Sequence, residues 1–471
     1  MSSTDYLVIG CGAMAMAFVD VMLQETDATF TIVDRRLAPG GHWNDAYPFV
    51  RLHQPSAYYG VASRPLGRGR IDERGFNAGF YELASGVEVT QYFHELMRDT
   101  FLASGRVDYY PLHDYVGNYA GDGEFVSLLS GERHRIAINK KLVNATMLQT
   151  SIPLTHKPNF TVATGITCIP PNHLPRLAAD FKRFTVLGGG KTGIDSAVWL
   201  LENGVKPDNI SWVVPRDPWM INRAGTQPGL EFFNRSLGGV AKQFEICATA
   251  RSVTELCERM EQAGMWMRLS SDVWPTLLHG ATVTETDLEH LRRIQNVIRL
   301  GHVQHIEASK IILDEGEAPS TIDTLYIDCT ARALAANVGN LTPVFDGDTI
   351  SLQMVRQFQP CFSASLIGHI EATISDDQEK KRLTQVVPMA DTIDDWISTQ
   401  ITSMTNQLTW ANHDINRWIQ TCRVNAFGST VAQVREDDNE KREILGRLSK
   451  YAQPAVENLR RLANNIGELN A

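Results

Sequence analysis

Gly10-Cys11-Gly12-Ala13-Met14-Ala15 follows the apolar run Tyr6–Ile9, and Gly188-Gly189-Gly190-Lys191-Thr192-Gly193 follows the apolar run Phe184–Leu187. In each stretch the first glycine permits a tight turn and the second lets the backbone approach a pyrophosphate. The third small residue allows a helix to pack closely on the preceding strand. Two such turns predict two dinucleotide sites in an α/β chain.

The residues after the first turn strengthen that interpretation. A helix pattern over Ala13–Leu23 leads to a second apolar run, Thr29–Val33, which ends in Asp34, 22 residues past Gly12. An acid at this place can accept hydrogen bonds from both hydroxyls of an adenine ribose. The alternative is a turn that only connects and packs two elements. The candidate residues of the first site are Gly10, Gly12, Ala15, Asp34 and Arg35.

The second turn continues differently, and the difference distinguishes the two nucleotides. Its helix, Thr192–Glu202, leads to a strand Ile210–Val214 that is followed by Pro215 and Arg216, with no acid at the strand end. A guanidinium there can bind a ribose 2′-phosphate, which predicts NADP(H), although Arg216 could also be a solvated loop charge. The candidate residues of this site are Gly188, Gly190, Lys191, Thr192, Gly193 and Arg216, and Arg223 either adds positive charge or lies on the surface.

Three further segments resemble one known group of enzymes. Gly40-Gly41-His42-Trp43 and Tyr47-Pro48-Phe49-Val50-Arg51-Leu52 are similar to the flavin-binding start of flavin-containing monooxygenases and their Baeyer–Villiger relatives. The late strand Thr324–Ile327, which runs into Asp328-Cys329-Thr330-Ala331, resembles the strand that returns the chain to the flavin in that family. The family's Phe-x-Gly-x-x-x-His stretch is absent. The resemblance implies FAD at the first turn and NADPH at the second.

The resemblance also implies a chemistry. A single-component monooxygenase of this kind reduces its flavin with NADPH and transfers oxygen from a peroxyflavin to a small organic substrate. The family places polar side chains facing the flavin where this chain has Arg51, His53 and Gln54, which become the candidate catalytic residues. Gly41, His42 and Trp43 would then lie against the cofactor, with Trp43 as a wall. Each of these residues also has an ordinary structural interpretation in a loop.

Two other functions remain open at this stage. A single-component flavin-dependent halogenase or an oxidase would carry the same two turns, and so would a non-catalytic redox sensor that binds the nucleotides. The four aromatic residues of the inserted region either line a substrate pocket or belong to the core. They are Phe232, Phe233, Trp266 and Trp274.

The order of the motifs predicts a nested α/β fold with two Rossmann-like domains. The FAD-binding domain is expected at 1–183 and 321–471, and the NADP-binding domain is inserted at 184–320. A helical insertion is expected at about 225–300, with helix-like spacing over Val253–Ala263 and Glu285–Leu300 and a cap at Thr284 or Thr286. The C-terminal part is also largely helical by pattern. Its apolar stripes lie within Asp394–Met404 and Asn439–Leu469, the latter including Ile466.

Composition excludes several classes of function. The 471 residues carry 44 basic and 54 acidic side chains, a net charge of −10, which disfavours nucleic acid and anionic membrane as partners. The seven cysteines form no C-x-x-C pair, and no H-E-x-x-H motif is present, so neither a dithiol nor a metal site is expected. The apolar segment Leu7–Val19 is too short to span a membrane. We expect a cytoplasmic enzyme acting on a small molecule and O2, and a homo-oligomer is an option that the sequence leaves open.

Overall fold

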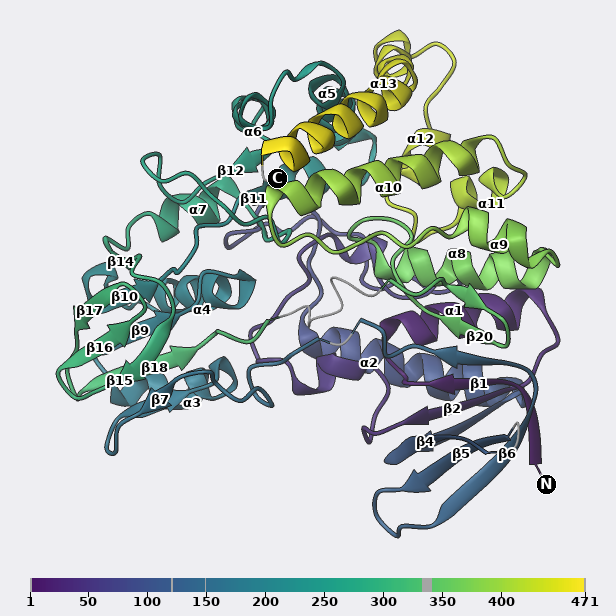
Figure 1. Cartoon of the computed structure of the whole chain (residues 1–471), viewed down its shortest axis with the longest axis horizontal. Coiled ribbons are helices and arrows are strands. Elements are labelled where there is room, and N and C mark those ends of the chain that lie inside the picture. The colour runs from purple at the N-terminus through teal and green to yellow at the C-terminus, as the bar shows by residue number, and fades with distance from the viewer. Residues whose placement is uncertain (1, 120–121, 149, 333–340, 470–471) are drawn as a thin grey trace.

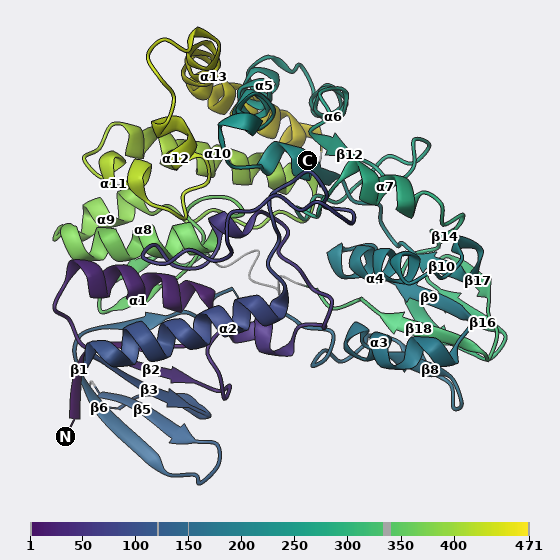
Figure 2. The same cartoon turned by 180° about the vertical axis from the view of Figure 1, so that it is seen from behind.

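The computed structural model describes residues 2–119, 122–148, 150–332 and 341–469. Two lobes, each built on a mainly parallel sheet, lie side by side beneath a layer of helices (Figure 1). The first lobe is at the lower right of that view and the second at the left, and Figure 2 shows the same arrangement from behind. Among the described residues, no helix combines the length and the apolarity needed to cross a membrane.

The first lobe is organised around the strand that precedes the first glycine turn. β1 (Ser2–Ile9) lies between β2 (Phe30–Asp34) and β6 (Arg133–Asn144), and parallel pairing continues to β3 (Val107–Pro111) and β20 (Thr349–Ser351). Every residue of β2 is buried, as expected for a parallel strand covered on both faces. The remaining strands, β19 (Phe345–Asp346), β4 (His113–Tyr119) and β5 (Asp122–Ser127), pair antiparallel at the edges.

Two helices cover one face of this sheet. α1 (Ala13–Glu25) starts directly at the glycine turn, and α8 (Pro360–Thr373) follows β20 after a loop. Their facing side chains share one hydrophobic core with β1 and β2. α2 (Gly86–Leu96) adds Val89 and Phe93 to the same core. The packing therefore fixes the N-terminus of α1, where the first nucleotide is expected.

The second lobe repeats the arrangement. Its parallel sheet has the order β14 (Asn296–Ile298), β10 (Ile210–Val213), β9 (Arg183–Leu187), β18 (Thr324–Asp328) and β8 (Thr167–Ile169). α4 (Lys191–Glu202) starts at the second glycine turn and packs on one face. The other face is covered by a smaller sheet, β7 (Thr161–Val162), β15 (Val303–Ile306), β16 (Lys310–Leu313) and β17 (Gly316–Pro319).

Strand pairing corrects two details of the sequence-based picture. β8 and β18 lie in the second sheet, so the chain enters the second lobe before Arg183 and leaves it after Thr321. The expected helix Glu285–Leu300 ends at Leu291 as α7 (Glu285–Leu291), and Asn296–Ile298 instead forms the edge strand β14 beside β10. Its expected cap at Thr284 is confirmed, because the Thr284 side chain accepts from the backbone N–H of Asp287.

The helical layer joins the inserted and C-terminal regions. α5 (Phe233–Thr249) and α10 (Ile393–Ala411) both pack against the long α13 (Asn439–Leu469), with α6 (Val253–Gln262) beside them. The side chain of Ile466 lies outside the described side chains. Of the four aromatic residues of the insertion, Trp266 and Phe233 are buried, Phe232 is partly accessible and Trp274 is 42% exposed.

Candidate functional site: two facing glycine turns

The first glycine turn is held by backbone contacts that only glycine permits. Gly10 has a φ of 94°, in the left-handed region, and its N–H donates to the carbonyl of Val33 at 2.8 Å. The Gly40–Gly41 pair packs onto the turn: Gly40 N–H donates to Cys11 O at 2.8 Å, and a Cβ on Gly41 would come within 2.9 Å of Gly12 Cα. The two glycine segments therefore form one unit.

Asp34 stands at the end of β2 beside this turn. One of its carboxylate oxygens accepts from Cys11 N–H at 2.5 Å and the other from Arg36 N–H at 2.7 Å. Burial raises the pKa of Asp34 in spite of these hydrogen bonds. Each oxygen retains a lone pair that can accept a ribose hydroxyl. Arg35 next to it points to solvent and pairs with Asp114 at 3.2 Å.

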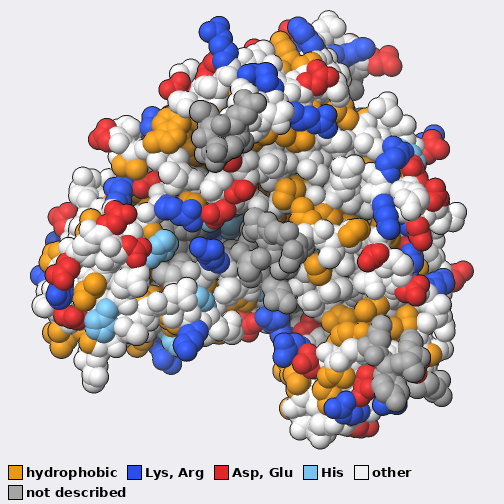
Figure 3. Space-filling view, in the orientation of Figure 1, with side chains coloured by type: hydrophobic (Ala, Val, Ile, Leu, Met, Phe, Trp, Pro, Cys, Tyr) orange, Lys and Arg blue, Asp and Glu red, His pale blue; other side chains and the backbone are white. Residues whose placement is uncertain are grey.

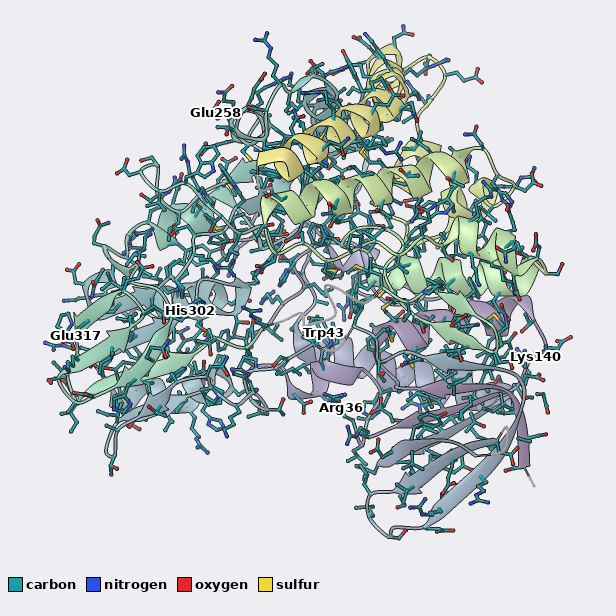
Figure 4. The ribbon with its side chains drawn as sticks, in the orientation of Figure 1. Arg36, Trp43, Lys140, Glu258, His302 and Glu317 are labelled. Atoms are coloured by element: carbon teal, nitrogen blue, oxygen red, sulfur yellow. The ribbon has the colours of Figure 1, made fainter. Side chains whose placement is uncertain are left out.

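His42 and Trp43 follow the glycine pair, and Trp43 packs against the core of the first lobe. The Trp43 indole N–H donates to the Tyr59 hydroxyl at 2.7 Å, and its ring stacks on His42 with centroids 5.5 Å apart. Burial lowers the pKa of His42 to about 4, so the imidazole is neutral. Figure 4 labels Trp43 at the centre of the molecule, with Arg36 nearby on the side of the first sheet. Ala15 is buried within α1.

The second glycine turn has the same geometry. Gly188 has a φ of 114°, and a Cβ there would come within 2.7 Å of the Cys329 carbonyl at the end of β18. A Cβ on Gly193 would overlap the Gly188 carbonyl, which also accepts from the Trp212 indole N–H at 2.9 Å. The first and last glycines of this turn are therefore required by packing within the protein.

The middle glycines of both turns, unlike the first and last glycines of the second turn, have free space around the position of a Cβ. A Cβ added to Gly190 would meet no atom within 4 Å, and a Cβ on Gly12 would meet only Gly41 Cα, at an ordinary 3.7 Å. Neither residue has a left-handed φ. Packing within the described protein does not require glycine at these two positions. Open space in front of a helix N-terminus is what a bound pyrophosphate needs, so both turns fit a dinucleotide.

A loop of the first lobe reaches the second glycine turn. Tyr47 donates a hydrogen bond of 2.6 Å to Asp195 on α4, and Asp195 also pairs with Lys191 of the turn. The Phe49 ring lies against Trp199 of the same helix, with centroids 5.5 Å apart. The Thr192 carbonyl, in the first turn of α4, accepts a hydrogen bond from the Ser196 hydroxyl. The two predicted nucleotide turns are thus joined through the segment that begins at Tyr47.

The three candidate catalytic residues do not all face the same space. His53 lies deep in the molecule, where burial and then the nearby Lys191 lower its pKa to about 3, yet its side chain remains partly accessible. Gln54 is also partly accessible and makes no side-chain hydrogen bond within the described part of the chain. Arg51 is exposed, and among the described residues its guanidinium hydrogen-bonds only to the Leu83 carbonyl, at 3.5 Å. His53 therefore lies near Lys191 of the second glycine turn, whereas Arg51 faces solvent.

Arg216 follows β10 and meets a partner that the sequence did not indicate. Its Nη1 lies 3.2 Å from the carboxylate of Asp391, which also binds the imidazole of His279. Although burial opposes it, these two contacts lower the pKa of Asp391. Arg223, in contrast, is buried and pairs with Asp287 at 3.3 Å, so it is not a surface residue.

Figure 3 shows lysine, arginine and histidine side chains gathered where the second lobe meets the helical layer, and a notch between the two lobes. Positive side chains at such a junction suit the phosphates of a nucleotide.

Comparison with known proteins places the chain in a family. No protein-family model matches it. A protein of Mycobacterium tuberculosis, described as uncharacterised, is 40% identical over 460 residues, which are 98% of this chain and 84% of the relative. A protein of Mycobacterium bovis, described in the same way, matches to the same extent. The chain belongs to the family of these mycobacterial proteins.

Solved structures confirm the fold class. The structure of cyclohexanone monooxygenase with bound ε-caprolactone has a TM-score of 0.51 and 14% identity, over 79% of this chain and 88% of that chain. A flavin-containing monooxygenase from Stenotrophomonas maltophilia has a TM-score of 0.47 and 13% identity, over 79% of this chain and 98% of that chain. The match to cyclohexanone monooxygenase shows that the chain has the α/β fold of flavoprotein monooxygenases with two Rossmann-like domains, as the motifs predict.

Proposed function

We propose that the protein is an FAD- and NADPH-dependent monooxygenase that acts on a small organic substrate. In the overall reaction, substrate, O2, NADPH and a proton give oxygenated substrate, NADP+ and water. The observation that carries the proposal is the free space beside Gly12 and Gly190, the middle glycines of the two turns. The hydrogen bond between Tyr47 and Asp195 connects the lobes that carry these turns. The junction favours transfer between two nucleotides, because it connects a loop of the first lobe to the helix that starts at the second turn.

The first lobe would hold FAD, which supplies the redox chemistry and the reaction with O2 when it is bound. Gly12 leaves room for the pyrophosphate, and Asp34 would accept the hydroxyls of the adenine ribose. Trp43, fixed by its hydrogen bond to Tyr59, would form a wall of the flavin site. Arg35 pairs with Asp114 at the surface, so only its backbone is suited to contribute here.

The second lobe would hold NADPH. Gly190 leaves room for the pyrophosphate, and Lys191 adds a positive charge beside it. Arg216 would bind the 2′-phosphate, in exchange for or in addition to its contact with Asp391. Nicotinamide and flavin would then meet near His53, which lies close to Lys191 of the second turn, and near the neighbouring Gln54.

His53 and Gln54 would orient the reacting groups. With a pKa of about 3, the His53 imidazole is neutral at physiological pH, so it would act as a hydrogen-bond donor or acceptor there and not as a cation. The Gln54 amide would donate to an oxygen atom of the reactants. A role for Arg51 would require its side chain to turn inward from the surface.

The decisive experiment is an anaerobic titration of the FAD-loaded protein with NADPH, followed by a pulse of oxygen. We expect NADPH to bleach the flavin absorbance and oxygen to restore it, with less H2O2 than NADPH consumed when a substrate is present. Full conversion of NADPH to H2O2 with every substrate would instead identify an oxidase. Absence of bound flavin, or flavin that NADPH does not reduce, would contradict the proposal.

Glycine variants separate the two nucleotide sites. Gly12→Ala should reduce the FAD content of the purified protein, whereas Gly190→Ala should keep FAD and weaken NADPH binding. Gly446→Ala on α13 is the matched control, because a Cβ there also meets nothing within 4 Å. This control should leave both nucleotides unaffected. Equal nucleotide binding by all three variants would contradict the assignment of the two turns.

A further inference from the structure

Arg356 is a half-buried cation that has no acidic partner among the described residues. It lies in the loop between β20 and α8, where burial lowers its pKa to about 10. Its Nη1 donates to the side-chain oxygen of Asn425 at 2.5 Å, and its guanidinium lies 5.3 Å from the centre of the Phe362 ring. Within the described residues, the printed partners of this guanidinium include no carboxylate. A deep charge without a counter-ion is costly, so it is retained where a ligand can neutralise it.

The unused donors of Arg356 face accessible space. Its Nε and Nη2 make no hydrogen bond to a described residue, and neither is sealed from solvent as the unpartnered Nε of Arg223 is. Two other deep arginines are bound to acceptors within the protein. Arg423 donates to the carbonyls of Ala57, Tyr59 and Val61, and Arg223 pairs with Asp287. Arg356 therefore differs from them in offering two free donors to the interior.

Two aromatic residues, Phe362 and Tyr58, lie near this guanidinium. Tyr58 is the titratable group that faces it, and the Tyr58 ring contacts Phe427 with centroids 5.8 Å apart. Phe427 and Phe358, which flank Asn425 and Arg356 in the sequence, have φ values of 72° and 56°. Non-glycine residues in this left-handed region are strained and cluster at ligand sites. The surroundings combine one anion-binding group with an apolar wall.

We propose that Arg356 binds the carboxylate of the substrate, which is a small organic acid with an apolar body. This inference rests on the proposed function and names its substrate class. A guanidinium with Nε and Nη2 free can hold a carboxylate through two parallel hydrogen bonds, and the aromatic rings would contact the hydrocarbon part. Asn425 is a positioning residue, because it orients the guanidinium through Nη1.

Calorimetric titration of the FAD-loaded protein with matched acids and amides tests this proposal. The pairs are hexanoate and hexanamide, phenylacetate and phenylacetamide, and indole-3-acetate and indole-3-acetamide. Each amide has nearly the shape of its acid without the charge. We expect at least one acid to bind tenfold or more tightly than its amide. If no acid exceeds its amide, the proposal is overturned.

Variants then assign the binding to Arg356. Arg356→Gln should weaken the preferred acid at least tenfold and leave its amide unchanged, and Arg356→Lys should recover part of the affinity. Asn425→Asp should also weaken the acid, because it would supply Arg356 with an internal carboxylate while the arginine remains. Arg98→Gln, a change at an exposed arginine, is the control and should have no effect. Unchanged acid affinity in Arg356→Gln would contradict the proposal.

Two measurements distinguish this inference from the proposed function. Flavin content and NADPH-driven bleaching without any acid report on the proposed function alone. Acid binding by calorimetry reports on Arg356 even if NADPH reduces nothing. Loss of bound FAD in Arg356→Gln, with acid affinity retained, would assign the arginine to the cofactor and overturn the substrate class.

Discussion

The Tyr47 hydroxyl donates a 2.6 Å hydrogen bond to the carboxylate of Asp195, and so links the loop of the first lobe to the helix that starts at the second glycine turn. Burial, and then the neighbouring Asp195, raise the pKa of Tyr47 well above its usual value, so the phenol stays a donor. Asp195 also holds Lys191. One carboxylate therefore connects the lobes and fixes a charged residue of the turn.

Removal of this hydroxyl tests the connection. Tyr47→Phe should lower the free energy of unfolding by about 1–3 kcal/mol, because the half-buried carboxylate of Asp195 loses a donor. It should also slow flavin reduction by NADPH more than it changes FAD content. Urea titration and stopped-flow absorbance measure the two effects. Tyr451→Phe on α13 is the control, and equal reduction rates in Tyr47→Phe and wild type would contradict the role of the link.

The Arg216–Asp391 pair predicts opposite effects of two substitutions on NADPH affinity. Arg216→Ala should weaken NADPH roughly tenfold or more and leave NADH nearly unchanged, since only NADPH carries the 2′-phosphate. Asp391→Asn should strengthen NADPH, because it removes a negative charge that competes for Arg216 at 3.2 Å. Titration of each cofactor measures the affinities. Parallel changes for NADPH and NADH would contradict the assignment of Arg216.

His53 predicts a loss of stability in mild acid. Its pKa of about 3 in the folded protein lies below the usual 6.5, so the unfolded chain takes up a proton first as pH falls. The contribution of His53 to the free energy of unfolding is fully present above pH 6.5. It is lost progressively as the pH falls from 6.5 toward 3. Between pH 7.5 and 5.5 the free energy of unfolding should fall by about 1.4 kcal/mol from this residue alone. His53→Gln should remove that part of the slope.

The control for this pH dependence is His94→Gln, a change at an exposed histidine of α2. In urea titrations at each pH, this variant should show the same dependence of the free energy of unfolding on pH as the wild type. His42, whose burial lowers its pKa to about 4, should keep a slope of the same sign in both variants. Identical pH dependence in wild type and His53→Gln would show that His53 is not buried as described.

The long C-terminal helix is predicted to be essential for stability. Leu459 on α13 is fully buried in the core shared by α5 and α10. Leu459→Ala should lower the free energy of unfolding by about 2–5 kcal/mol, the range for cavities in such cores. Leu129→Ala, at a leucine that is 81% exposed, should change it little. A small effect at Leu459 would mean that the helix packs loosely.

Local patterns predicted both glycine turns because the information they carry is local. A strand, a glycine run and a helix are contiguous, and Asp34 and Arg216 follow at fixed distances along the chain. The stretch Glu285–Leu300 was mistaken for one helix, because its short apolar runs satisfy helical spacing as well as strand spacing. Pairing with β10, which no local pattern reveals, makes Asn296–Ile298 a strand.

Contacts between residues far apart in the chain, which determine the surroundings of the candidate site residues, could not be predicted from the sequence. Asp391 reaches Arg216 from a distant part of the chain, and Asp195 looks like an ordinary helix residue until Tyr47 is placed beside it. Arg356 has no motif at all, and only its depth and its lack of an acid distinguish it. Such features depend on tertiary packing, and a single sequence gives no access to them.

The position of β20 bears on how the chain is made. Thr349 pairs with Leu142 of β6 only after the whole second lobe has been synthesised, so the first lobe emerges from the ribosome with one edge of its parallel sheet unpaired. An unpaired edge invites association with other chains. The nested arrangement that brings the two nucleotide turns together therefore exposes the nascent protein to aggregation until its last strand arrives.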